Sequence, residues 1–139
     1  MNTEETRIQE LEAELHPDKL LHREVTQAII GAAFEVYAKL GFGFLEKVYQ
    51  RALQVELLRA GHTVELEKPI TIKYKGVNVG EYFADALVEE KVIVEIKVAA
   101  EYNRLDEAQL LNELKATDIR VGLLLNFGRN KLQFRRFVM

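Results

Sequence analysis

Two carboxylates and a lysine are closely spaced between Asp85 and Lys97, in the segment DALVEEKVIVEIK. Two apolar, strand-like runs flank the charged residues 89–91, a pattern that predicts a three-residue hairpin loop. With that loop Asp85 lies opposite Glu95, and directly opposed residues of paired strands share a face with Cβ atoms about 4.5–5.5 Å apart. Lys97 follows Glu95 by two residues, so it lies on the same face because strand side chains alternate with period two.

This cluster suits the site of a metal-dependent phosphodiesterase. Two ionised carboxylates at that separation repel each other, so they need a cation or a shifted pKa. Mg²⁺ prefers carboxylate oxygens and keeps several of its waters, which makes Asp85 and Glu95 candidate ligands for Mg²⁺ or Mn²⁺. Lys97 would position a water beside the metal or stabilise the phosphate in the transition state.

The competing interpretation of these residues is purely structural. Glu95 would pair with Lys97 or Lys91 at the surface, and Asp85 would hydrogen-bond to a neighbouring turn. Acids on strands apolar enough to be central are costly without a function, which favours the site over the ion pairs.

Glu46 and Gln109 are two further polar candidates. Glu46 stands at the start of a predicted helix, where the helix dipole alone explains a carboxylate. Gln109 and Asn112 are three residues apart and share a face of another predicted helix, where an exposed polar stripe is the usual explanation. From the residues alone, neither belongs to the site.

The apolar periodicity predicts the elements that position these residues. A period of 3.6 predicts an amphipathic helix from Val25, ended by residues 41–43, and a second helix over 45–60. A period of two then predicts strands at 64–66, 70–74, 82–88 and 92–98, followed by a helix over 105–114 and strands at 121–125 and 132–138. The strand at 92–98 is apolar on both faces, which is typical of a covered central strand. The expected fold is α/β, an αβα sandwich around a mixed β-sheet.

The length of 139 residues indicates one domain. Residues 1–23 are expected to form a helical extension, interrupted by Pro17, and residues 24–139 the domain itself. The sequence has no cysteine, no visible secretory signal and no apolar run near the ~20 residues of a membrane span. It therefore excludes thiol chemistry and predicts a cytoplasmic protein without a membrane partner.

The charge distribution leaves two interpretations open. The net charge of −3 argues against indiscriminate binding to nucleic acid, yet no acidic residue follows Asp118. The basic residues beyond it form either a solvated tail or a surface for a polyanion. They are Arg120, Arg129, Lys131, Arg135 and Arg136.

From about Val25 to Phe137 the sequence resembles the GxxExxY family, a bacterial and archaeal branch of the PD-(D/E)XK nuclease superfamily. The spacing Asp-x9-Glu-x-Lys at 85–97 is the core signature of that superfamily. The other matching motifs are GFLEKVYQRAL at 43–53, YKG at 74–76, EAQLLN at 107–112 and GLLLNFG at 122–128.

The resemblance implies a restriction-endonuclease-like core with Glu46, Asp85 and Glu95 around Mg²⁺ or Mn²⁺. It further implies Lys97 as the catalytic lysine and Gln109 as an auxiliary residue. Glu46 and Gln109, which the residue types alone did not assign to the site, thereby become candidate site residues. The expected function is hydrolysis of phosphodiester bonds in nucleic acid, DNA rather than RNA, with a homodimer left open. The alternative is a catalytically silent nuclease-fold module that binds nucleic acid or a protein partner.

The sequence departs from the family pattern at three positions. The family usually has His, Pro and Tyr where this chain has Tyr37, Phe42 and Glu113. Glu113 matters most, because it follows Gln109 by four residues and brings negative charge near the site. It would either weaken phosphate binding or supply a further metal contact.

Overall fold

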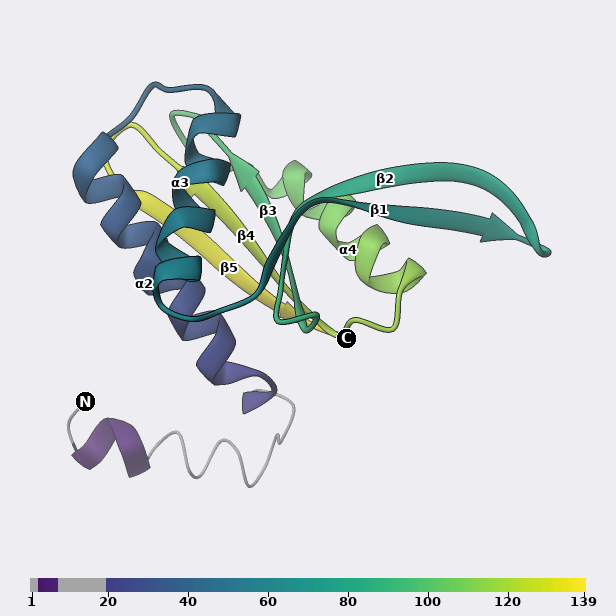
Figure 1. Cartoon of the computed structure of the whole chain (residues 1–139), viewed down its shortest axis with the longest axis horizontal. Coiled ribbons are helices and arrows are strands. Elements are labelled where there is room, and N and C mark those ends of the chain that lie inside the picture. Colours follow the sequence, from purple (N-terminus) through teal and green to yellow (C-terminus); the bar gives the residue numbers. More distant parts are fainter. Residues whose placement is uncertain (1–2, 8–19) are drawn as a thin grey trace.

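A five-stranded mixed β-sheet with helices on both faces forms the centre of the computed structural model, which describes residues 3–7 and 20–139 (Figure 1). The elements in chain order are α2 (Arg23–Leu40), α3 (Glu46–Arg59), β1 (Val64–Tyr74), β2 (Val77–Val88), β3 (Val92–Lys97), the short 3₁₀ helix η2 (Arg104–Asp106), α4 (Glu107–Ala116), β4 (Val121–Phe127) and β5 (Leu132–Val138). The strands lie in the order β1-β2-β3-β4-β5, and only the β3–β4 pair is parallel among these described strands. The predicted αβα arrangement is confirmed.

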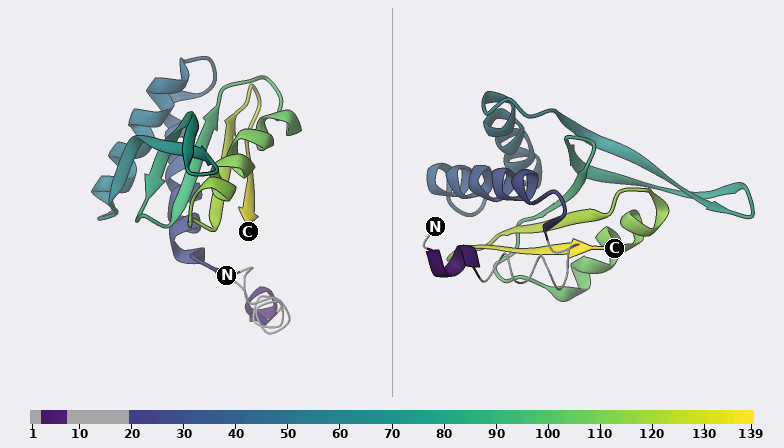
Figure 2. Two further views of the ribbon diagram at one scale, coloured as in Figure 1. Left: turned by 90° about the vertical axis from the view of Figure 1, so that its right-hand side faces the viewer. Right: turned by 90° about the horizontal axis from the view of Figure 1, so that it is seen from below.

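Helices α2 and α3 cover one face of the sheet and α4 covers the other (Figure 2). The sheet has an apolar core on each face, and alternating residues of β3 contribute to the two cores, as its apolar residues on both faces predicted. Val92, Val94 and Ile96 pack toward α2 and α3, whereas Ile93 packs toward α4. Every residue of β3 except Lys97 is buried, so this strand is central.

The connection between α2 and α3 is held by one aromatic residue. Helix α2 ends at Gly41, whose φ of 68° lies in the left-handed region that glycine tolerates best. The hydroxyl of Tyr49, in the first turns of α3, donates to the Gly41 carbonyl at 2.5 Å, and its ring stacks on Phe127 with centroids 4.4 Å apart. These contacts fix Tyr49, and with it the first turn of α3 that carries Glu46, beside Gly41 and Phe127.

Strands β1 and β2 form a long hairpin whose outer part projects from the sheet as an arm (Figure 1). The prediction of separate strands at 64–66 and 70–74 is wrong, because β1 runs continuously through Pro69. An edge strand tolerates proline, since one side of its backbone has no partner strand. The predicted turn at the tip is confirmed, with Lys75 and Gly76 at φ of 50° and 79°. Such paired left-handed residues match the twist of a hairpin.

The β2–β3 hairpin has the predicted register. Val88 pairs with Val92 and Ala86 with Val94, so the loop comprises residues 89–91. The ladder ends at Ala86–Val94, one pair before Asp85 and Glu95. Asp85 and Glu95 therefore face each other just beyond the last hydrogen-bonded pair of the two strands.

The start of the chain bears only partly on the predicted extension. Residues 3–7 are helical, and the remainder of the 1–23 segment before residue 20 lies outside the described residues, so the extension stays a prediction. Within residues 3–7 and 20–139, none of the helices combines the length and the apolar character that a membrane crossing requires.

Candidate active site

The site begins where β2 leaves β3 to enter the arm. Beyond Ala86 the two strands no longer pair, which removes the ladder partner of the Ile96 amide. The Oδ2 atom of Asp85 accepts from that amide at 2.7 Å and so replaces the missing backbone carbonyl. The Asp85 side chain is thus fixed at the divergence point, next to the central strand.

Glu95 is an acid inside the protein. Its side chain extends from β3 toward α4, is 3% exposed and lies within hydrogen-bonding reach of the carboxyls of Glu113 and Asp85. Burial raises the pKa of Glu95, and the contact with Glu113 and the charge of Asp85 raise it further. Its Oε1 atom has no hydrogen-bond partner within the described chain. Glu95 therefore needs a proton or a cation.

Asp85 experiences opposing influences. Partial burial raises the pKa of its carboxyl, whereas the hydrogen bond from the Ile96 amide, the contact with Glu95 and the charge of Lys97 lower it. The result is a raised pKa, so the two neighbouring acids share an environment that disfavours two negative charges without a cation.

Lys97 and Glu46 complete the group at the end of β3. Lys97 is half-buried, and its charge lowers the pKa of Asp85 and of Glu46. Glu46 reaches solvent, yet partial desolvation followed by the charge of Asp85 outweighs Lys97 and raises the pKa of Glu46. The charges of Glu46 and Lys97 thus act on Asp85 or respond to it, and Asp85 in turn influences Glu95.

Gln109 is exposed on α4 and reaches the group through another residue. Its Nε2 atom lies 3.4 Å from Oε2 of Glu113, one helical turn along. Glu113 is 0% exposed and faces Glu95. The residue that α4 places against the acids is therefore Glu113, and Gln109 lies at its outer side.

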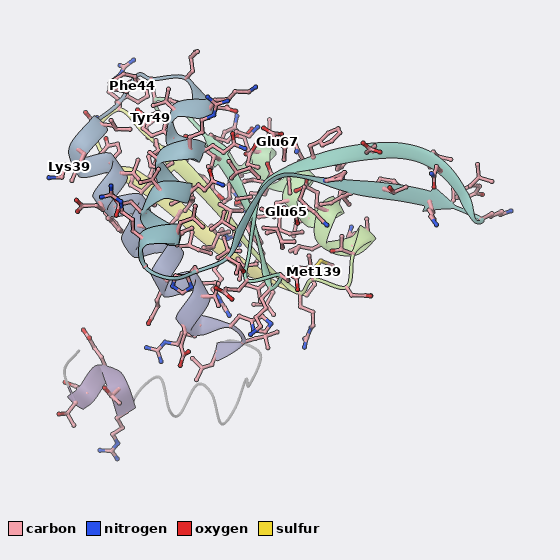
Figure 3. The ribbon with its side chains drawn as sticks, in the orientation of Figure 1. Lys39, Phe44, Tyr49, Glu65, Glu67 and Met139 are labelled. Atoms are coloured by element: carbon pink, nitrogen blue, oxygen red, sulfur yellow. The ribbon has the colours of Figure 1, made fainter. Side chains whose placement is uncertain are left out.

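Two residues at the site were missed in the sequence. Gln50 of α3 is 5% exposed, and its Nε2 atom donates to the Asp85 carbonyl at 2.8 Å and to Oε1 of Glu67 at 3.1 Å. Gln50 follows Glu46 by four residues, a spacing that places both on one helix face and was the available signal. Glu67 gave no such signal. It lies at the base of the arm beside α3 (Figure 3), with a left-handed φ of 53° that marks the bend.

The donor set fits a hard divalent cation. Carboxylate oxygens of Asp85 and Glu95 are the ligands such ions prefer, and the unpartnered Oε1 of Glu95 is an atom that a cation would satisfy. In the part of the chain that the structure describes, no set of three or more His, Cys, Asp or Glu side chains is arranged as the ligands of one ion. Water and substrate oxygens would have to supply the remaining positions.

The basic residues after Asp118 are mostly engaged within the fold. Arg135 contacts both carboxylate oxygens of Glu107 at 3.2 and 3.1 Å, and Arg136 donates to the Leu21 carbonyl. Arg120 donates to the Met139 carbonyl at 2.6 Å. These three side chains therefore bind groups of the protein itself. The C-terminal basic residues are thus not simply a surface for a polyanion.

Comparisons with known proteins agree with this geometry. The sequence model of the PD-(D/E)XK nuclease superfamily matches residues 23–137, and no protein of curated function matches the chain. The crystal structure of SSO0001 is similar, with a TM-score of 0.50 and 17% sequence identity over 66% of this chain. The match spans 48% of SSO0001, so it concerns the fold alone. Both findings agree with a restriction-endonuclease-like α/β core, and the chain belongs to the PD-(D/E)XK nuclease superfamily.

Proposed function

We propose that this protein is a Mg²⁺- or Mn²⁺-dependent nuclease that hydrolyses phosphodiester bonds, with DNA as the expected substrate. The observation that carries the proposal is the buried Glu95 carboxyl beside Asp85, with one unpartnered oxygen. Asp85 and Glu95 would hold the ion, and Glu46 would contribute from α3. When bound, the metal would lower the pKa of a coordinated water and neutralise charge on the phosphate. Within the superfamily, the motifs favour the GxxExxY branch, and the absence of cysteine suits a cytoplasmic location.

Lys97 would be the catalytic residue, and the influence of its charge on Asp85 supports that role. A preorganised ammonium group stabilises the negative charge that develops on the phosphate, and it does so without moving at the moment of reaction. The segment after β3 is held by Asn126, whose side chain bonds both the Ala99 amide and the Ala99 carbonyl at 3.0 Å. That clamp limits the motion of the backbone that carries Lys97.

A hollow between the arm and α4 supports a nucleic-acid partner. Its volume is about 660 Å³, and it is lined by Thr71, Ile72, Lys73, Tyr82, Asn112, Lys115 and Ala116. Lysines from both walls suit phosphates, and a tyrosine offers a ring for base stacking. Asn112 shares a face of α4 with Gln109, three residues before it, and Gln109 in turn contacts Glu113. A strand in the hollow would therefore pass close to the acids.

A nuclease-fold module that binds without cutting is the second candidate. The observation that favours it is the lack, within residues 3–7 and 20–139, of three side chains arranged to hold one ion. In that case the hollow would bind nucleic acid and the buried acids would remain a structural cluster. Both candidates share the partner, so a cleavage assay separates them.

The test compares wild type with Lys97→Ala and Asp85→Asn on plasmid, linear duplex, single-stranded DNA and RNA, with Mg²⁺ and with Mn²⁺. Lys97→Ala should lose about 10²–10³ in rate while metal affinity stays nearly intact, because the lysine acts on charge and is not a ligand. Asp85→Asn should lose metal and turnover together. Lys39→Ala, on α2 far from the base of the arm, is the control (Figure 3). Equal rates of cleavage by wild type and Lys97→Ala would refute the proposal that the protein is a nuclease.

A further inference from the structure

An apolar cluster lies at the surface of the loop between α2 and α3. Phe42, Phe44 and Leu45, here called the loop patch, are 38%, 49% and 79% exposed. The backbone beneath them is fixed, because the Tyr49 hydroxyl donates to the Gly41 carbonyl and accepts from the Phe44 amide at 3.3 Å. Single exposed apolar residues are normal, whereas three large ones in one short loop mark an interaction surface. The loop patch therefore has the character of a binding site.

A cationic turn adjoins the loop patch. The guanidinium of Arg129, in the turn between β4 and β5, lies 6.0 Å from the centre of the Phe42 ring, within the range of a cation–π contact. The same turn carries the exposed Lys131, and neither residues 41–45 nor residues 128–131 include an acid. Exposed rings beside cations match a single nucleic-acid strand, whose bases stack on rings and whose phosphates pair with arginine and lysine.

The loop patch also adjoins residues of the candidate active site. Leu45 directly precedes Glu46 in the chain. The Arg129 amide donates to the Ala100 carbonyl at 3.3 Å, and Ala100 follows Lys97, the last residue of β3, by three positions. Figure 1 shows the connection between α2 and α3 on one side of β3 and the arm on the other. A strand that enters from the hollow and passes Glu46 would therefore reach the loop patch.

We propose that the loop patch stacks on an unpaired base next to the scissile phosphate, so that the substrate is DNA with unpaired nucleotides at the cleavage position. This inference rests on the proposed nuclease function and adds the form of its substrate. In a regular duplex the bases are paired and stacked on each other, so a base must leave the stack before another ring can reach its face. Every base has such a face, so recognition should follow strand structure and not sequence.

A second copy of the chain is the other occupant that apolar rings could fit. A two-fold contact joins the same patch of both copies. It would bring Arg129 and Lys131 of one copy toward the same cations of the other, and like charges across an interface are costly. The charges therefore favour a nucleic-acid strand.

The first experiment measures binding of a fluorescent single-stranded DNA by anisotropy, with Ca²⁺ in place of Mg²⁺ because it takes the same kind of oxygen ligands. Phe44→Leu should weaken binding by about 5–150-fold, which corresponds to the loss of one stacked base. Phe44→Tyr retains a ring and should bind as wild type does. On a blunt duplex, wild type and Phe44→Leu should have equal affinity. Circular dichroism establishes that each variant is folded.

The matched control is Leu58→Ala. Leu58 is 52% exposed in the last turn of α3, at the opposite end of that helix from the loop patch. Its replacement should leave every affinity unchanged. A loss equal to that of Phe44→Leu would show that any exposed apolar residue of this helical layer supports binding, and the inference would be wrong.

The second experiment separates stacking from phosphate contacts. A strand of abasic nucleotides keeps the phosphates and lacks the bases, so wild type and Phe44→Leu should bind it equally well. Arg129→Gln should weaken binding of the normal and the abasic strand alike, because it removes a phosphate contact from both. An equal loss for Phe44→Leu on the two strands would overturn stacking.

Failure of this inference is distinguishable from failure of the proposed function. Equal affinity of wild type and Phe44→Leu for the single strand would overturn the inference and leave cleavage that depends on Lys97 untouched. A wild-type dimer in sedimentation that Phe44→Leu dissociates would assign the loop patch to a second copy and overturn it as well. Binding that depends on Phe44, without cleavage of any DNA, would overturn the proposed catalysis but keep the loop patch as a surface for unpaired bases.

Discussion

Replacing Glu95 by Gln tests the electrostatics of the site without any nucleic acid. The substitution keeps the size of the side chain and removes its charge. In the metal-free protein, burial and the neighbouring acids raise the pKa of Glu95 well above its ordinary value of 4.5. The native state therefore retains a proton near neutral pH that the unfolded chain releases. This difference links the stability of the protein to pH.

The sign follows from the proton count. Above about pH 5.5 the native state binds one more proton than the unfolded state, so the free energy of unfolding falls by about 1.4 kcal/mol for each pH unit. Between pH 5.5 and pH 7.5 this amounts to about 2.7 kcal/mol. Well below the ordinary pKa of glutamate both states are protonated and the penalty disappears. The raised pKa of Asp85 acts in the same direction, but it is present in wild type and variant alike.

The assay is urea unfolding followed by circular dichroism at several pH values in EDTA. Relative to wild type, Glu95→Gln should gain stability steadily from pH 5.5 to pH 7.5, and its own dependence on pH should be shallower. Glu65→Gln is the control, because Glu65 is an exposed acid of β1 that pairs with Lys68 at 3.4 Å. Parallel curves for wild type and Glu95→Gln would refute the argument, since they would mean that Glu95 is ionised in the native state.

Two further substitutions test packing and the proposed partner. Gly122→Ala should cost about 1–3 kcal/mol of unfolding free energy, because a Cβ at this position lies 2.7 Å from Cδ1 of the buried Leu110, and urea unfolding measures it. No loss would mean that Leu110 moves aside freely. Lys73→Glu and Lys115→Glu should each weaken the binding of a fluorescent single-stranded DNA. Each should also make the affinity less dependent on salt, because every lost phosphate contact lowers the slope of log K against log salt by about 0.7. Unchanged slopes in fluorescence anisotropy, with EDTA present, would exclude the hollow as the binding surface.

Local patterns were sufficient for much of the fold. The apolar residues on both faces of β3 predicted a central strand, and the three charged residues after Val88 predicted a tight loop. The structure has both features. Both features depend on spacing along the chain, because side chains of a strand alternate whatever surrounds it. The same alternation placed Glu95 and Lys97 on one face. The glycine at position 41 ended α2 for an equally local reason, its φ of 68°.

Tertiary structure decided the environment of each acid. The family resemblance identified Glu113 as a negative charge near the site, and the packing of α4 on the sheet buries its carboxyl beside Glu95. The bend at Glu67, the hydrogen bonds of Gln50 and the place of Pro69 in an edge strand likewise depend on partners distant in sequence. Burial and charge contacts are properties of the space around a side chain, and those shift its pKa. Spacing along the chain therefore identified the acids, whereas the assembled layers determined how costly their charges are.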